Sequence, residues 1–222
     1  MPEESESRTR PKPRIESLSD MVFGLALSVG AITLVGNPPT NTTELASDIA
    51  TFAFSFLILI NVWMRYTKIM SVLPLENRWT ISLNTFLLFI VSIEPFLFNL
   101  FFRTNSSTSP GYYNVLSIAY GADLGILMLI LGFFTTVLAD EQRKLVPKDM
   151  LKEFNYDAIS FYFSAALFFV SALIPLSVPG IGIPLRFDLW LVPFLVGALR
   201  RRGRDVIKEV QRSRPKSKRI AS

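Results

Sequence analysis

Long apolar stretches separated by short polar connectors dominate this sequence. Six of them have roughly the twenty residues that an α-helix needs to cross about 30 Å of hydrocarbon. We place these spans at residues 18–36, 45–65, 80–102, 113–138, 156–176 and 183–199. The connectors are rich in Gly, Pro, Asn, Ser and Thr, which are typical of loops. The pattern predicts an all-α membrane protein with six transmembrane helices.

Basic residues gather in alternate connectors and predict the orientation. Only Arg103 and Arg186 fall on the less basic side, both at span ends. By the positive-inside rule the basic side is cytoplasmic, so both termini are expected there, as an even number of spans requires. The chain then divides into a basic leader at residues 1–17, a six-helix transmembrane domain at 18–199 and a basic tail at 200–222.

The basic tail has two interpretations. Ten Lys and Arg residues lie between positions 200 and 219. Near a membrane surface each can attract anionic lipid headgroups by about 1 kcal/mol. A solvated topology anchor is the simpler interpretation, and binding of anionic lipids is the alternative. We expect no nucleic-acid partner, because no base-stacking aromatic residues are interleaved with the charges.

Several kinds of chemistry have no residues to carry them. The chain contains no cysteine and no histidine, which excludes thiolate catalysis, disulfides, the usual zinc ligand sets and imidazole acid–base chemistry. No nucleophile–base pair or metal-binding cluster stands at a recognisable spacing. We therefore expect a protein that is not an enzyme and that holds no cofactor or metal.

The first span differs from the others in its small residues and in one aliphatic stripe. Its small residues permit close helix approach, as expected at the centre of a bundle or an oligomer. They are Gly24, Ala26, Ser28, Gly30 and Ala31. Alternating four- and three-residue steps place Leu18, Val22, Leu25, Val29, Ile32 and Gly36 on one helical face. This face either packs against other helices or lines a pore, and the pattern alone favours packing.

The residues that open the first span resemble a known family. The segment RIESLSD at residues 14–20 looks like the R-x-x-x-F-S-D signature of the transmembrane protein 175 family of potassium channels. Arg14, Ser19 and Asp20 match that signature, and Leu18 replaces its phenylalanine. The likeness continues in the second and third spans at Trp63, Asn84 and Pro95.

This resemblance implies a pore at the centre of an oligomer, lined by the first spans of its subunits. Potassium would be the permeant ion, and we expect a homotetramer in a prokaryotic cell membrane. The resemblance places a hydrophobic constriction at Leu25, a hydroxyl group at Ser28 and further pore-facing aliphatics at Val29 and Ile32. No TVGYG-like carbonyl filter is present, so we expect only a modest preference for potassium over sodium.

Polar residues near the inner mouth raise two questions. The family carries a histidine close after the tryptophan of the second span, and here Tyr66 occupies roughly that place. A hydrogen-bond network built on imidazole must therefore be rebuilt or missing. Arg14 and Asp20 fit an ion-paired network, or a helix cap with Ser17 as N-cap and Asp20 three residues later. These two interpretations are compatible.

Two acidic residues, Glu94 and Asp123, fall inside predicted spans. Both lie about 12 to 15 Å below the outer surface at 1.5 Å per residue. Acids inside a membrane usually face a cavity or a partner. Three interpretations stay open: a cation-attracting outer vestibule, the coupling site of a proton- or cation-driven secondary transporter, and a neutral hydrogen-bonded pair between helices. Against the transporter, no pair of broken helices appears in two matching halves.

Overall fold

The computed structural model describes residues 12–36, 38–74, 77–102, 109–181 and 184–193, together with residues 195 and 197. Five long helices make up most of this part of the chain. They are α1 (Lys12–Gly36), α2 (Thr42–Met70), α3 (Arg78–Phe102), α4 (Pro110–Ala139) and α5 (Lys148–Leu173). A short 3₁₀ helix, η1 (Glu141–Arg143), joins α4 to α5.

All five helices are long and apolar enough to cross a membrane, which confirms the prediction of an all-α membrane protein. Of the sixth predicted span, residues 185–193 are helical, and most of the remainder lies outside the described residues. The cytoplasmic placement of the termini stays a prediction. Residues 1–11 of the leader and residues 198–222, which include the basic tail, also lie outside the described part.

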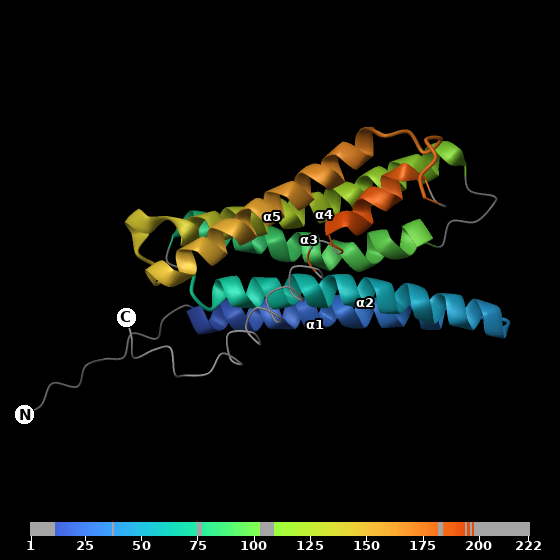
Figure 1. Cartoon of the computed structure of the whole chain (residues 1–222). Coiled ribbons are helices and arrows are strands. Elements are labelled where there is room, and N and C mark those ends of the chain that lie inside the picture. The colour runs from blue at the N-terminus through green and yellow to red at the C-terminus, as the bar shows by residue number, and fades with distance from the viewer. Residues whose placement is uncertain are drawn as a thin grey trace, which may run out of the picture.

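Helix α3 connects two pairs of helices. Figure 1 shows α1 and α2 side by side along one edge of the bundle, with α4 and α5 along the opposite edge and α3 between them. In agreement, α3 packs against both α1 and α4, and α5 packs mainly against α4. We call the end where α1 begins and α2 ends the inner end, and the other end, where α2 begins, the outer end.

Several helices start or end outside the apolar spans that predicted them. Helix α1 begins at Lys12 rather than at residue 18, and α5 begins at Lys148 rather than at residue 156. In the added turns of α5, Leu151 and Phe154 are buried, so these turns are amphipathic. A search for uniformly apolar stretches therefore does not detect them. Ser17 lies inside α1, so the prediction that it is an N-cap is wrong.

The outer end of α2 is closed by a polar cap. Asn41 Oδ1 accepts a hydrogen bond from the backbone N–H of Glu44 at 2.8 Å. In return, Glu44 Oε2 accepts from the N–H and the hydroxyl of Thr40, both at 2.7 Å. These bonds satisfy donors that a helix start leaves without partners, and they fix where α2 begins.

Arg186 holds the helical stretch 185–193 at the outer end of the bundle. Its guanidinium is buried and donates to the carbonyls of Ser171 and Ile174, with distances between 2.6 and 3.1 Å. It also donates to Asn114 Oδ1 at 2.9 Å and to Ser117 Oγ. The carbonyl end of a helix carries partial negative charge, so the end of α5 stabilises the buried cation.

We expect Arg186→Met to lower the free energy of unfolding by about 3 kcal/mol or more, since each buried acceptor left without a donor costs about 1–3 kcal/mol. Thermal unfolding of the detergent-purified protein measures this loss. Arg143→Gln is the control, because Arg143 pairs with Asp140 on the surface at 3.2 Å and its loss should cost less than about 1 kcal/mol. Equal losses would contradict a supporting role for Arg186.

Candidate pore helix and its polar anchor

One face of helix α1 packs against the other helices of the subunit, and its opposite face is exposed. Ser19, Phe23 and Ala26 are buried on the inside face. In the most apolar stretch of α1, residues 15–32, only 17% of the residues are buried, compared with 67% in α4. A membrane helix that its own subunit covers so poorly must meet lipid, another subunit or the water of a pore.

The exposed face of α1 contains the predicted pore residues. We call this the bare face, and its large side chains are Leu18, Met21, Leu25 and Ile32. Ser28 is also exposed, and Val29 is partly exposed at its edge. Met21 was not among the predicted pore residues, although it precedes Leu25 by four residues and therefore lies on the same face.

The hydroxyl of Ser28 has a defined direction. Ser28 Oγ donates to the carbonyl of Gly24 at 2.8 Å. This bond uses the only hydrogen of the hydroxyl and leaves its oxygen lone pairs free to accept. Ser28 therefore presents an acceptor on the bare face, which suits a cation.

Two hydrogen bonds attach α1 to α2, and a third joins α2 to α3. Trp63 Nε1 on α2 donates to Asp20 Oδ1 at 3.1 Å. The hydroxyl of Tyr66, also on α2, hydrogen bonds with Ser19 Oγ at 2.6 Å and with Asn84 Oδ1 of α3 at 2.8 Å. We call these five residues the anchor. They join α1, α2 and α3 in the inner half of the bundle.

Tyr66 occupies the centre of the anchor, in the place where the family carries a histidine. Its side chain is buried, and its ring lies 5.3 Å from the ring of Phe23. Tyrosine ordinarily titrates near about 10, whereas histidine titrates near about 6.5. The anchor is thus built on a group that stays neutral at physiological pH. Of the other motif residues, Leu18 lies on the bare face and the side chain of Arg14 lies outside the described part.

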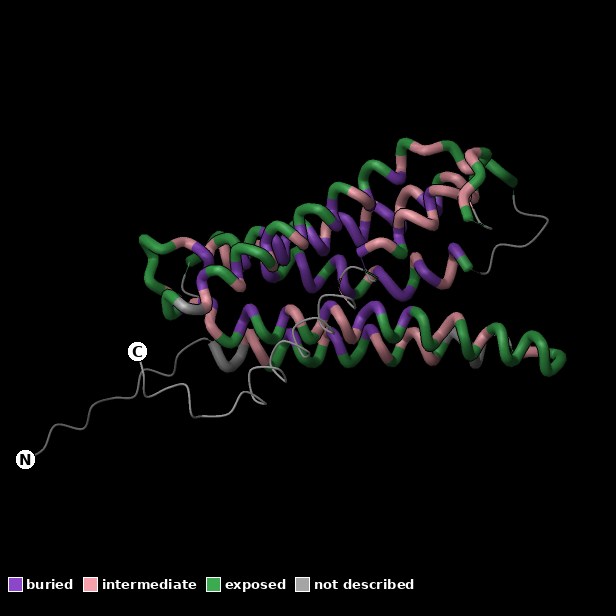
Figure 2. Tube along the Cα trace, viewed as in Figure 1, coloured by how far each residue is buried: buried purple, intermediate pink, exposed green. Residues whose placement is uncertain are grey.

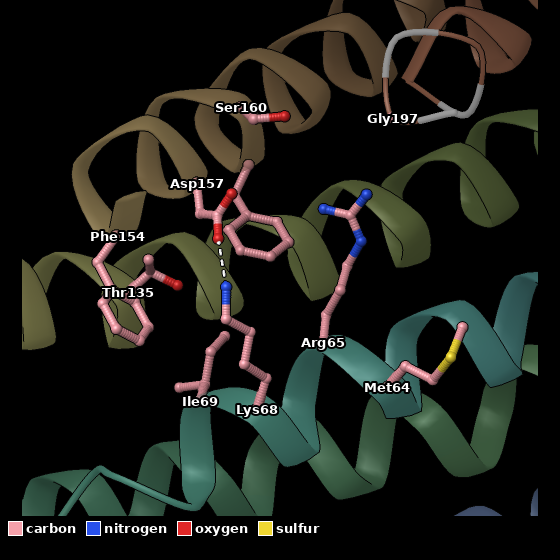
Figure 3. Close-up of a pocket in the computed structure, with 10 residues that line it drawn as sticks. Met64, Arg65, Lys68, Ile69, Thr135, Phe154, Asp157, Ser160 and Gly197 are labelled. Carbon is pink, nitrogen blue, oxygen red and sulfur yellow. Dashed lines mark hydrogen bonds and ion pairs between the residues drawn. The ribbon is translucent and has the colours of Figure 1, made fainter. Parts of the chain in front are cut away.

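A polar pocket of about 180 Å³ joins α2 to α5 near the inner end. Figure 3 shows Lys68 and Arg65 of α2 opposite Phe154 and Asp157 of α5. Lys68 Nζ lies 2.8 Å from Glu153 Oε1 and 3.1 Å from Asp157 Oδ2, and 5.2 Å from the centre of the Phe154 ring. These charges pair with one another, so we assign the pocket to helix packing. The same end of α2 thus binds α1 on one side and α5 on the other.

Glu94 and Asp123 meet inside the subunit in its outer half. Glu94 is fully buried on α3, and Asp123 on α4 is 5% exposed. The hydroxyl of Tyr120 donates to Glu94 Oε1 at 3.2 Å. Neither Glu94 Oε2 nor Asp123 Oδ2 has a hydrogen-bond partner among the described residues. Because both acids are buried, the structure favours the interpretations that keep them inside the helix bundle.

No metal-binding cluster is found in the part of the chain that the structure describes. Within it, no three histidine, cysteine, aspartate or glutamate residues lie close enough together to hold an ion.

Loss of the Tyr66 hydroxyl should weaken the anchor. We expect Tyr66→Phe to lower the free energy of unfolding by about 1–3 kcal/mol, because it removes the hydroxyl that bonds with the buried Asn84 Oδ1 and Ser19 Oγ. Ser19 keeps only its bond to the carbonyl of Ile15. Tyr162→Phe is the control, since the Tyr162 hydroxyl contacts Thr136 at an exposed position. Combining Tyr66→Phe with Ser19→Ala should cost less than the sum of the two single changes. Additive losses in thermal unfolding would show that these residues are not coupled.

Comparisons with known proteins point to one family. Residues 14–95 match the family model described as the endosomal/lysosomal potassium channel TMEM175. This stretch begins at the RIESLSD segment, contains the anchor and ends beside Glu94 in α3. No curated protein matches this chain.

Two solved structures share the fold of most of the chain. One is the crystal structure of a lysosomal potassium-selective channel TMEM175 homolog from Chamaesiphon minutus. It is 19% identical, with a TM-score of 0.58 over 85% of this chain and 97% of that one. The other is a variant of the potassium channel MtTMEM175 in complex with a nanobody–MBP fusion protein. It is 17% identical, with a TM-score of 0.62 over 85% of this chain and 93% of that one. The family match agrees with the resemblance that the RIESLSD segment predicts, and the two solved structures show that the chain shares their fold.

Proposed function

We propose that this chain is one subunit of a potassium-permeable cation channel whose central pore is lined by copies of α1. The bare face around Leu25 carries this proposal, because the subunit leaves an apolar helix face uncovered while hydrogen bonds hold its opposite face in place. The family match supports potassium as the permeant ion. Both structural neighbours are named as potassium channels.

A single subunit cannot form this pore, because one helix cannot surround a water-filled path. Closed cyclic symmetry supplies the other copies, and we propose a homotetramer. Gly24 lies beside the bare face, and a methyl group built on it would meet no heavy atom within 4 Å. This open position lets the helix of a neighbouring copy approach closely. We place the assembly in a prokaryotic cell membrane, with the basic tail near anionic lipids on the cytoplasmic side.

The gate in this proposal is a ring of Leu25 side chains. A narrow apolar neck does not hold a continuous water column, so it blocks hydrated ions without a physical plug. Met21 and Ile32 extend the apolar lining on either side. Ser28, almost one turn further outward, offers hydroxyl oxygens in place of part of the hydration shell of an ion. So few oxygens give only a modest preference for potassium over sodium.

The secondary-transporter alternative has less support. Transporters of that kind bind their ions where membrane helices are unwound near the bilayer midplane. Helices α1 to α5 are each continuous along their described length, including α3 around Pro95. Glu94 and Asp123 lie in such continuous helices, so we do not assign them to coupled transport.

The proposed assembly should have the mass of four copies of this chain. Native mass spectrometry of protein extracted in a mild detergent should show a tetramer as the main species. A protein that is strictly monomeric in detergent and in liposomes, and that still conducts potassium, would contradict the central pore.

The proposed gate predicts that Leu25→Ser hydrates the neck and raises resting potassium flux in liposomes. We expect at least about a tenfold rise, which corresponds to about 1.4 kcal/mol off the barrier. Ile159→Ser on α5 is a matched control, because Leu25 and Ile159 are both 64% exposed. Leu27→Ser is a second control, on the side of α1 that packs against the core. If all three variants give the same flux, α1 does not line the pore.

A further inference from the structure

A small polar cavity leads from the outer half of α2 toward the buried acids. It has a volume of about 70 Å³ and lies between α1, α2 and α3. Its polar lining includes Asp48, Thr51, Ser55 and Asn99. A space of this size is large enough to hold water.

Three of these residues form one polar stripe on α2. Asp48, Thr51 and Ser55 follow one another at steps of three and four, so they lie on one face of the helix. Residues 42–50 are almost entirely exposed, as the green outer turns of α2 show in Figure 2. Asp48 therefore lies at the aqueous end of the cavity.

The other end of the stripe lies beside α3, near Glu94. Ser55 is only 4% exposed and lines the cavity. Pro95, the next residue of α3, lines the cavity. Proline has no N–H, so the carbonyl of Val91 loses its helical donor and adds a further acceptor near Glu94. The buried end of the cavity is thus lined by the residue that follows Glu94 in α3.

Charges around the two acids do not neutralise them. On α4 the titratable neighbours are Tyr120 and Asp123 itself, and on α2 the acidic Asp48 lies at the far end of the cavity. The buried Arg186 donates its hydrogen bonds to the end of α5 and to polar residues of α4. Two neighbouring carboxylates in a low-dielectric interior, with no cation beside them in the described part of the chain, do not both stay ionised.

We propose that Glu94 and Asp123 form a proton-binding site in each subunit, which exchanges protons with the outer solution along the cavity lined by Asp48, Thr51 and Ser55. A bound proton supplies the donor that the orphan oxygens of the two carboxyls lack. The ligand is a proton rather than a metal ion, because the site offers only two carboxyls and a few hydroxyls. The cavity is lined by Gly30, which lies on the opposite side of α1 from Leu25, so the site is separate from the proposed pore.

Infrared difference spectroscopy of the full chain in liposomes tests for the bound proton. Protonated carboxylic acids give their own C=O stretching band. Exposed Asp and Glu lose their protons near about pH 4, so the part of the band that vanishes between about pH 6 and about pH 9 should come from the buried acids. Glu94→Gln and Asp123→Asn should each remove this titrating part, whereas Leu25→Ser should leave it unchanged. A band whose intensity does not change over this pH range would overturn the site. So would a band that titrates in Glu94→Gln and in Asp123→Asn as it does in the parent protein. Native mass spectrometry confirms that each variant assembles as the parent does.

Exchange into D₂O tests the route. Thr51→Val keeps the shape of the side chain but removes its hydroxyl, and Ser55→Ala removes the hydroxyl beside Glu94. Both should slow deuterium exchange of the titrating band by at least about tenfold, which corresponds to about 1.4 kcal/mol, and leave its amplitude intact. Thr43→Val is the matched control, since Thr43 is exposed in the first turn of α2, outside the cavity. Exchange at the parent rate in both cavity variants would refute the proposed route.

Discussion

The buried hydroxyl of Tyr66 connects three helices and decides which face of α1 is left uncovered. In a water-soluble protein, the burial of apolar side chains would suffice to hold a helix in place. In lipid, the surroundings are as apolar as the helix itself, so packing and hydrogen bonds must hold it. Helix α1 buries little of its surface, and its position therefore depends on the contacts of Ser19 and Asp20 with α2, where Tyr66 in turn contacts Asn84 of α3. The direction of the bare face follows from those contacts.

Other polar residues also hold helices together by hydrogen bonds and ion pairs. Arg186 attaches residues 185–193 to the ends of α4 and α5 at the outer end, and Lys68 attaches α2 to α5 at the inner end. Each contact joins helices that are distant in sequence. The acids Glu94 and Asp123 differ, because each keeps one oxygen without a hydrogen-bond partner among the residues that the structure describes.

Hydropathy predicted the five described long helices and a sixth span, of which residues 185–193 are helical, and the RIESLSD segment predicted the resemblance to the family, because both depend on local sequence. They did not predict that Tyr66 contacts Ser19 and Asn84, since this needs the relative rotation of three helices. The early start of α1, which removes Ser17 from a cap position, depends on turns that are not uniformly apolar. The burial of Arg186 was equally out of reach, because a basic residue at a span end usually faces water. Equal depth did suggest that Glu94 and Asp123 could meet, but not that both are enclosed.

The hydrogen bond from Ser28 to Gly24 has an electrostatic consequence for the proposed pore. With its hydrogen turned toward the helix, the hydroxyl is a small dipole whose negative end faces away from α1. Copies of this dipole around an axis would create a negative potential without any ionised side chain, and residues 21–36 contain no acid. Such a preorganised ring needs no reorientation when an ion arrives. The channel would then distinguish cations from anions by dipole orientation rather than by net charge.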